Sequence, residues 1–166
     1  MESTYTEILM SGNGQYGGLG NNVLTTAQSN ASRVKAVSGL KQYNDKTNAL
    51  EAIKPEEITV GPTGHVLLAI NSAADSHGVG GSDVMVWGRN FDAELGNGKK
   101  SSVSAPIHLD LAEGERLMLM ERTAKEVKDL HGKVWKKGVK VRQQVAAGYG
   151  TSAVYWKIEN KRFPPC

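Results

Sequence analysis

The stretch GNGQYG at residues 12–17 is the clearest candidate for chemistry in this sequence. It follows the apolar run EILM and matches G-x-G-x-x-G, the glycine pattern with which a dinucleotide-binding turn approaches a pyrophosphate. That function also requires a helix N-terminus after the glycines and an acidic residue about 20 positions further on. Here GLGNNVLTT follows, and the next acidic residue is Asp45. A dinucleotide-dependent oxidoreductase is therefore kept only as a remote alternative.

Other residues with chemical potential do not form a recognisable catalytic or metal-binding pattern. The four histidines are scattered, and Asp75 with His77 is the nearest approach to a ligand pair, whereas a zinc site requires three or four ligands. No serine lies in a G-x-S-x-G elbow. Asp92 and Glu94 flank a turn, and we interpret them as an exposed acidic turn rather than an acid/base pair. We expect no enzyme activity, no cofactor and no metal.

Basic residues are concentrated between positions 125 and 142, where seven stand against two acidic ones in a chain whose net charge is only +3. Such a run is most often a solvated face, but it also attracts an acidic partner, an anionic membrane or nucleic acid. Nucleic acid is the least favoured of these because the net charge is small. The candidate contacts for an acidic partner or lipid are Lys133, Lys136, Lys137, Lys140 and Arg142.

The chain contains an internal repeat, which decides against the dinucleotide interpretation. SGNGQYGGLGNN from Ser11 aligns without a gap with WGRNFDAELGNG from Trp87, 76 positions later, and ITVGPTGHV from Ile58 aligns with VAAGYGTSA from Val145, 87 positions later. The second copy keeps the leucine and the last glycine but loses G-x-G-x-x-G. The repeated residues are therefore expected to be structural, the leucines in the core and the glycines at turns or close approaches. They are Gly12, Leu19, Gly20, Gly61, Trp87, Gly88, Leu95, Gly96 and Gly148.

Short strands separated by glycine-rich turns are expected to position these residues. The segments with β-branched residues or period-two alternation are residues 7–11, 58–70 around a GPTG turn, 83–87 and 139–156 around a GYG turn, with further strands at SRVKAV and ERLMLM. Two short helices are also expected. One begins at a capping box formed by Thr123 and Glu126 and stops at Gly132, and the other covers residues 46–53 with Asp45 as its cap.

These motifs resemble the blade repeat of the regulator of chromosome condensation family, whose units read roughly V-x-x-W-G-x-N-x-x-G-Q-L-G-x-G, then a proline-led strand, then V-A-A-G-x-x-H-S. The matching residues are WGRNFDAELGNG, SAPIHL and VAAGYGTSAVYW. The sequence departs from the pattern at Ala93 and Glu94, and Gly64 and Thr151 stand where the family commonly has histidine. The resemblance implies an all-β partial β-propeller of about two antiparallel blades with up to four strands each and one or two short helices in insertions.

The same resemblance sets our expectations for domain organisation. Residues 1–166 form one partial propeller domain, with repeat unit one at about 7–71, repeat unit two at about 83–158 and a tail at 159–166. The family's propellers have seven blades, so the chain is expected to be a fragment that needs its missing blades, self-association or a covering segment. Met1 to Met10 could add a strand to the last blade, and the segment from Thr123 could cover a sheet face.

Two segments, NFDAELGNGKKSS and GYGTSAVYWKI, resemble a particular subgroup of the family. These are fungal mitochondrial members, which are associated with assembly of the cytochrome bc1 complex. The resemblance implies a non-catalytic protein-interaction scaffold in mitochondria. The alternative within the family is a guanine-nucleotide exchange or chromatin-binding module, nuclear or cytoplasmic. No mitochondrial targeting pattern is visible in the first twenty residues.

Overall fold

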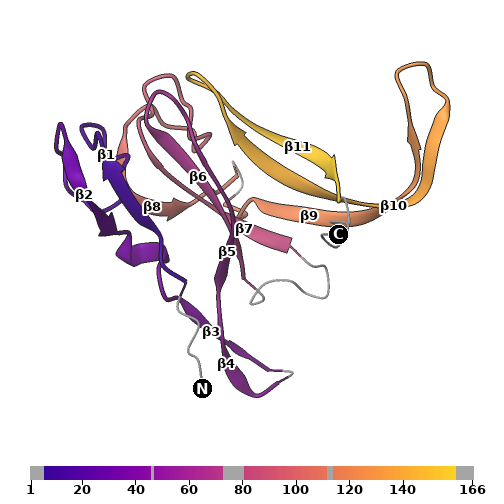
Figure 1. Ribbon diagram of the computed structural model, residues 1–166, viewed down its shortest axis with the longest axis horizontal. Coiled ribbons are helices and arrows are strands. Elements are labelled where there is room, and N and C mark those ends of the chain that lie inside the picture. The colour runs from indigo at the N-terminus through magenta and orange to yellow at the C-terminus, as the bar shows by residue number, and fades with distance from the viewer. Residues whose placement is uncertain (1–5, 46, 73–80, 112–113, 160–166) are drawn as a thin grey trace, which may run out of the picture.

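The computed structural model describes residues 6–45, 47–72, 81–111 and 114–159, and within them the chain is all-β. The fold class expected from the sequence is thus confirmed, and the antiparallel, partly curled sheets are consistent with a partial propeller (Figure 1). The strands are β1 (Leu9–Gly12), β2 (Gln28–Arg33), β3 (Lys41–Asn44), β4 (Ala49–Ala52), β5 (Lys54–Val60), β6 (His65–Asn71), β7 (Gly81–Gly88), β8 (Val103–His108), β9 (Met118–Lys128), β10 (Val134–Ala147) and β11 (Ser152–Ile158).

The middle of the molecule is an antiparallel sheet in the order β5, β6, β7, β8, which we call the central sheet. The side chains of β6 from His65 to Ile70 are all buried, although successive residues of a strand point to opposite faces. Both faces of the sheet are therefore covered. This explains why HVLLAI is a continuous apolar run rather than an alternating one.

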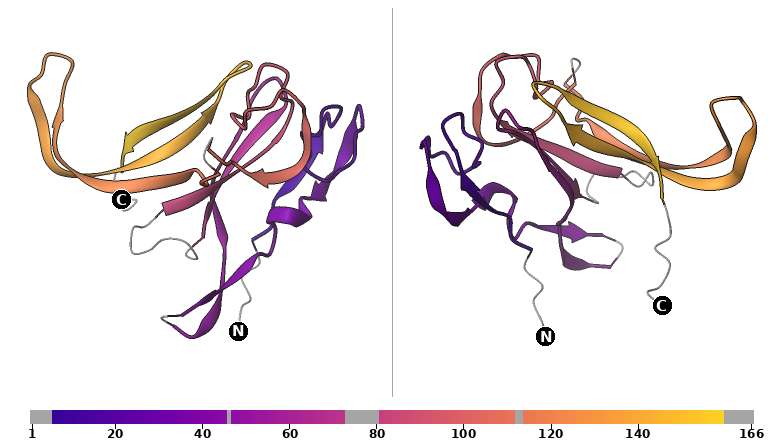
Figure 2. Two further views of the ribbon diagram at one scale, coloured as in Figure 1. Left: turned by 180° about the vertical axis from the view of Figure 1, so that it is seen from behind. Right: turned by 45° about the horizontal axis from the view of Figure 1, so that its top comes forward.

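One face of the central sheet packs against β1 and β2, which form a separate two-stranded sheet that we call the leading half-sheet. A single 3-10 turn at Lys35–Val37 follows β2 and contributes Val37 to this interface. The resulting core combines residues of both layers, namely Ile8, Val34, Val37, Val66, Leu68, Ile70, Met85 and Trp87. Figure 2 shows this half-sheet beside the central strands from two further directions.

The other face is covered because the sheet curls back on itself. The lower end of β7, Gly81–Asp83, pairs with β9, which continues through β10 to β11. The upper part of β10 with β11, residues 141–158, forms what we call the trailing half-sheet. Its Val145 joins Leu67, Ala69, Val84 and Val86 in a second core, together with Leu95, Leu109 and Leu119.

Both expected helices are wrong, because these segments are strands. Thr123 and Glu126 lie within β9, opposite Lys140 and Lys137 of β10. Residues 49–52 form β4, which pairs with β3 in a two-stranded hairpin. Among the described residues, the 3-10 turn is the only helical element.

The sheets cut across the boundaries of the two sequence units. Unit one, residues 7–71, supplies β1 and β2 to the leading half-sheet but β5 and β6 to the central sheet. Unit two supplies β7 and β8 to the central sheet and β10 and β11 to the trailing half-sheet. The structure therefore contains one complete four-stranded sheet with a two-stranded half on each face, rather than one sheet per unit.

Candidate interaction surface

The glycine motif at residues 12–17, which matches a dinucleotide-binding pattern, forms the end of a strand and a turn. Gly12 ends β1 with a φ of 109°, and its repeat partner Gly88 ends β7 with a φ of 100°. Gly20 and Gly96 share a φ of 65°, a left-handed conformation that glycine adopts without steric cost. Residues 13–27 contain no helix, so no helix N-terminus follows the glycines.

The repeated apolar residues lie between the sheet layers. Leu19 and Leu95 are buried, and Leu95 belongs to the core under the trailing half-sheet. Trp87 is fully buried in the opposite core, and its indole N–H donates to the carbonyl of Gly18 at 2.9 Å. This bond ties the first repeated turn to the central sheet.

Gly61 and Gly148 each begin a hairpin loop, and both lie close to a side chain of the same loop. A Cβ atom at Gly61 would collide with the ring of His65, and one at Gly148 would stand 2.7 Å from Thr151 Oγ1. The first hairpin closes at Val60 and Val66 and the second at Ala147 and Ser152, so the first loop is one residue longer.

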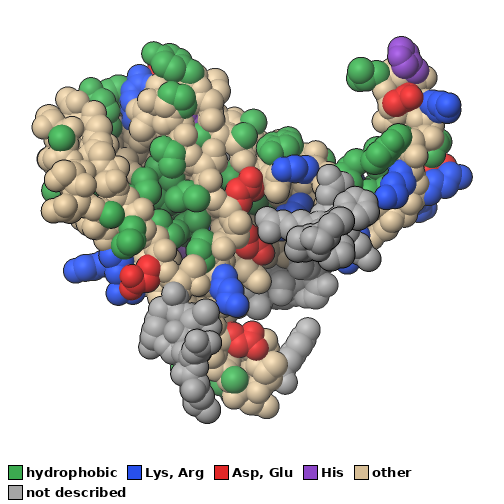
Figure 3. Space-filling model, in the orientation of Figure 1, with side chains coloured by type: hydrophobic (Ala, Val, Ile, Leu, Met, Phe, Trp, Pro, Cys, Tyr) green, Lys and Arg blue, Asp and Glu red, His purple; other side chains and the backbone are tan. Residues whose placement is uncertain are grey.

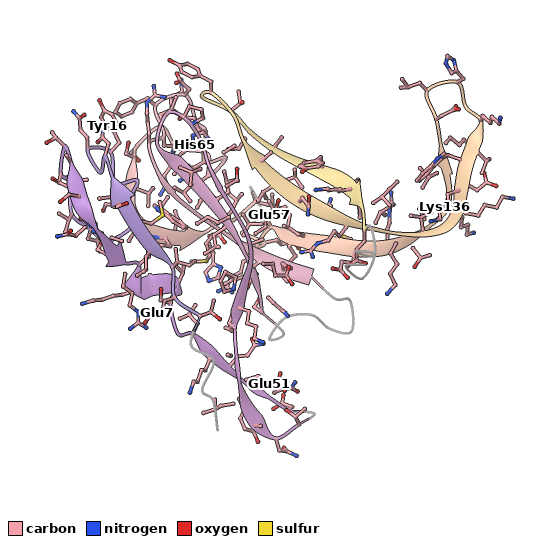
Figure 4. All side chains as sticks on the ribbon, viewed as in Figure 1. Glu7, Tyr16, Glu51, Glu57, His65 and Lys136 are labelled. Atoms are coloured by element: carbon pink, nitrogen blue, oxygen red, sulfur yellow. The ribbon has the colours of Figure 1, made fainter. Side chains whose placement is uncertain are left out.

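This extra residue gives His65 a role that the sequence alignment did not identify. His65 is fully buried, its Nε2 lies 3.1 Å from the carbonyl of Thr151, and its Nδ1 lies 2.9 Å from Thr63 Oγ1. A carbonyl oxygen can only accept, so Nε2 carries the proton and Nδ1 accepts from the hydroxyl. The ring therefore joins the central and trailing sheets; Figure 4 labels His65 beside β6.

The sequence predicted an exposed acidic turn, but only Asp92 is exposed, whereas Glu94 is buried. Its carboxylate accepts from the Arg89 guanidinium at 2.8 Å and from the backbone N–H of Asp92 at 2.9 Å. Asp92 itself is largely exposed and binds Arg89 at 3.0 Å. Both oxygens of Glu94 are thus engaged in holding the turn, and this carboxylate is a structural group.

The histidines do not form a metal centre within the part of the chain that the structure describes, where no cluster of three or more potential ligands occurs. His77 and Asp75 lie outside the described residues. His131 is exposed at the tip of the β9–β10 hairpin, far along the chain from any other histidine.

The basic stretch forms a projecting two-stranded hairpin, which we call the basic arm and define as residues 123–140 of β9 and β10. It extends away from the three sheet layers, as Figure 1 shows, and several blue side chains lie along it in Figure 3, among hydrophobic and acidic ones. Opposed pairs share a face, and the register pairs Lys140 with Thr123 and Lys136 with Val127. Lys125, Lys136 and Lys140 therefore lie on one face of the arm.

The candidate contacts of the basic stretch do not all have the same freedom to bind a partner. Arg142 lies at the base of the arm and is held by Glu56 at 2.6 Å and Glu121 at 3.8 Å. Lys137 pairs with Glu126 across the strands at 3.5 Å. Lys133, Lys136 and Lys140 are exposed, and Figure 4 shows Lys136 on the arm away from the body.

The tip of the arm also exposes apolar side chains. Leu130 is completely accessible and Trp135 is largely accessible. At the base, the Arg122 guanidinium stacks 4.3 Å above the ring of Trp156. An arm with this composition presents cations together with an apolar tip.

The arm was not predicted, because residues 123–132 were expected to form a helix. A turn signal was nevertheless present in the sequence. Asp129 Oδ1 accepts from the backbone N–H groups of His131 and Lys133, both at 2.9 Å, and Gly132 has a φ of 79°. An aspartate followed three residues later by glycine, between two lysine-rich segments, is typical of a hairpin turn.

The fold and these surfaces define an all-β chain whose candidate interaction surface is a basic hairpin. No helix among the described residues is long and apolar enough to cross a membrane. The chain matches no protein-family model, no curated protein and no solved structure.

Proposed function

We propose that the chain is part of a β-propeller of the regulator of chromosome condensation type and acts as a non-catalytic protein-interaction scaffold. The observation that carries this proposal is the central sheet, which has four antiparallel strands and a further sheet layer on each face. Sheets packed radially in this way are the building unit of propellers. The repeat residues WGRNFDAELGNG begin on the third strand of that sheet.

The proposed setting is the mitochondrion, where the protein supports assembly of the cytochrome bc1 complex. The resemblance of NFDAELGNGKKSS and GYGTSAVYWKI to fungal mitochondrial members supports this setting. The basic arm supports it independently, because a cationic hairpin with an apolar tip suits an anionic membrane surface or an acidic protein segment.

The test is genetic and biochemical and uses the full gene in a fungal host. A fluorescent fusion is expected to colocalise with mitochondria, and deletion is expected to reduce assembled cytochrome bc1 complex on native gels without reducing ATP synthase. Re-expression with Lys125, Lys136 and Lys140 changed to Gln should restore assembly only in part, whereas the same change at Lys54, Lys99 and Lys100 should restore it fully.

Two outcomes would replace this proposal. Nuclear localisation with guanine-nucleotide exchange on a small GTPase would favour the exchange or chromatin-binding module. Binding of a nicotinamide or flavin cofactor to the purified protein, measured by titration of cofactor fluorescence, would instead support the oxidoreductase, although the turn at residues 12–17 lacks the helix that this chemistry uses.

A further inference from the structure

β1 of the leading half-sheet and β11 of the trailing half-sheet each have a strand edge without a partner among the described residues. Within the described residues, β1 pairs with β2 alone and β11 pairs with β10 alone. Edges of this kind present free N–H and C=O groups that can pair with another strand. The side chains beside these edges are apolar and accessible, since Leu9 is 54% exposed and Val154 is 42% exposed.

The leading half-sheet is the structural equivalent of β7 and β8, the second half of the central sheet. Leu9, Met10 and Gly12 pair with Arg33, Ser32 and Gln28. At the equivalent positions of the central sheet, Met85, Val86 and Gly88 pair with His108, Ile107 and Val103. Both pairs of strands shift register at the same place, one residue before the glycine, so the equivalence extends to the bulge.

The trailing half-sheet is the equivalent of β5 and β6, the first half of the central sheet. Both are hairpins whose loops begin with a glycine, Gly61 in one and Gly148 in the other. When the closing pairs of the two hairpins are aligned, Ser152 corresponds to Val66 and Val154 to Leu68. The chain therefore holds one complete sheet and the two complementary halves of another.

A single copy cannot join its own halves. The leading half-sheet packs on one face of the central sheet and the trailing half-sheet on the other. Figure 2 shows β1 and β11 on opposite sides of the central strands. The expectation that Met1 to Met10 could complete the last blade of the same copy is not met by the described residues, in which β1 does not reach β11.

We propose that copies of this chain associate head to tail, with β11 of one copy pairing antiparallel with β1 of the next to complete a four-stranded sheet. The pairing of β6 with β7 defines the register, because Leu68 stands opposite Met85 and Ala69 opposite Val84. In the composite sheet Val154 is opposite Leu9 of the next copy, and Tyr155 is opposite Ile8. This inference rests on the strand registers and goes beyond the proposed assembly role.

The side chains that meet in this register suit each other. Val154 and Leu9, both exposed in a single copy, lie opposite each other on the face that points toward the central sheet of the first copy. Tyr155, 41% exposed, lies on the other face beside Ile8, which already packs on the central sheet of the second copy. Each composite sheet is thus covered on both faces, as the central sheet is.

Head-to-tail contacts are heterologous and form a ring when the rotation between copies closes. Each copy contributes the central sheet and two half-sheets, which together supply the strands of two sheets. Propellers usually contain about four to eight sheets. A closed ring is therefore expected to contain about two to four copies, and hence an even number of sheets, which differs from the seven blades of the family that the sequence resembles. The β1 and β11 edges described above are then paired.

The test uses disulfide trapping in the full chain with Cys166 changed to Ser. A Leu9→Cys protein mixed with a Val154→Cys protein is expected to give a disulfide-linked dimer, because directly opposed residues of antiparallel strands lie within disulfide reach. Neither protein alone should cross-link, since the contact joins two different edges. A chain with both substitutions should form a ladder of covalent oligomers.

The shifted pair Met10→Cys and Val154→Cys is the register control and should not cross-link, because a shift of one residue moves the side chain to the other face. Light scattering of the unmodified chain should give about two to four times the 17.8 kDa of one copy. A monomer at every concentration, equal cross-linking of either single-cysteine protein, or cross-linking of the shifted pair would each overturn the proposal. None of these results affects mitochondrial localisation or the bc1 phenotype, so failure of the two proposals is distinguishable.

Discussion

Gly12 and Gly88 have similar positive φ angles at equivalent strand ends but different surroundings. A Cβ atom at Gly88 would collide with the carbonyl of Gly64, whereas at Gly12 it would meet nothing within 4 Å. Gly12→Ala should therefore cost only the conformational strain, about 1–2 kcal/mol. Gly88→Ala should cost at least ~2 kcal/mol more because it overpacks the sheet. Urea unfolding of both variants measures the difference, and equal costs would show that the loop at Gly64 moves aside freely.

Leu95 tests the interpretation of the repeated leucines as core residues. It is fully buried under the trailing half-sheet, so Leu95→Ala should reduce the free energy of unfolding by about 2–5 kcal/mol. Leu24→Ala is the matched control, because Leu24 is an exposed leucine in the first repeat, and it should change stability by less than about 0.5 kcal/mol. Similar effects in the two variants would contradict this assignment.

Among the residues that the structure describes, Glu51 in the β3–β4 hairpin has a clearly lowered pKa; Figure 4 labels this residue. Hydrogen bonds from Asn44 Nδ2 at 2.9 Å and from Thr47 Oγ1 at 2.8 Å hold the pKa of Glu51 below its ordinary value. A depressed carboxylate pKa stabilises the hairpin above the pKa of the unfolded chain, and this contribution disappears as the pH falls through the folded pKa.

The pKa of Glu51 can be followed by NMR titration of its side-chain carboxyl. Asn44→Ala should raise the pKa toward that of an ordinary glutamate, and Thr47→Val should raise it by a smaller amount, since Asn44 is the larger cause. A titration curve for Glu51 that neither substitution moves would show that these two hydrogen bonds do not form in solution.

The repeat predicted residue roles well where both copies have the same loop length and poorly where they do not. Leu19, Leu95 and Trp87 could be assigned to the core because a gapless alignment fixes their positions. His65 could not, because the extra residue in its hairpin shifts it by one position relative to the family pattern. The burial of Glu94 also escaped prediction, since its partner Arg89 becomes close only when the turn folds.

At the scale of elements, several strands were predicted correctly, but both expected helices were wrong, and SRVKAV, expected as a strand, is the end of β2 followed by the 3-10 turn. Capping signals act locally, but an isolated helix of about two turns is marginal in water. Pairing of β9 with β10 over residues 121–128 instead satisfies the backbone groups of both strands. In the β3–β4 hairpin, Asn48 adopts a φ of 50°, a conformation that asparagine tolerates and that favours a turn over a helix.

The basic arm should bind anionic membranes through one face. Changing Lys125, Lys136 and Lys140 to Gln removes three cations from that face, and at about 1 kcal/mol each this should weaken binding to cardiolipin-containing vesicles about 100-fold. Binding should fall as salt rises, and neutral phosphatidylcholine vesicles should bind weakly. Vesicle co-sedimentation measures both effects.

Three lysines outside the arm provide the matched control for charge. Changing Lys54, Lys99 and Lys100 to Gln lowers the net charge equally but should leave vesicle binding nearly unchanged. An equal loss in the two triple variants would mean that net charge, rather than the arm, drives association. Binding that persists at high salt would point to the exposed Leu130 and Trp135 at the tip as the main contact.

At the scale of the whole molecule, the repeat revealed the layered architecture but not where each sheet begins and ends. Sequence units start at the strongest motif, whereas a sheet is defined by which strands pair. The motif at Trp87 lies on the third strand of the central sheet, so a unit that starts there takes its first two strands from one sheet and its last two from the next. Only the strand registers carry this information.

The layered architecture also predicts how stability is distributed over the molecule. β6 and β7 are buried on both faces by the two cores, so their backbone amides can exchange with solvent only when the layers separate. The β3–β4 hairpin and the outer part of the basic arm have mostly exposed side chains and can open locally. Hydrogen exchange followed by mass spectrometry should therefore show slow exchange in β6 and β7 and fast exchange in both hairpins.

The exchange pattern of the two half-sheets adds a test of the composite sheet. Amides of β1 and β11 should exchange quickly in dilute protein, where their outer edges face water, and more slowly at concentrations where copies associate. Val154→Lys should abolish this concentration dependence, and combining it with Leu9→Glu should restore it, because opposite charges then face each other across the contact. Exchange in β6 and β7 should stay unchanged throughout, since neither substitution lies in the two cores; faster exchange there would mean that the variant disturbs the central sheet itself.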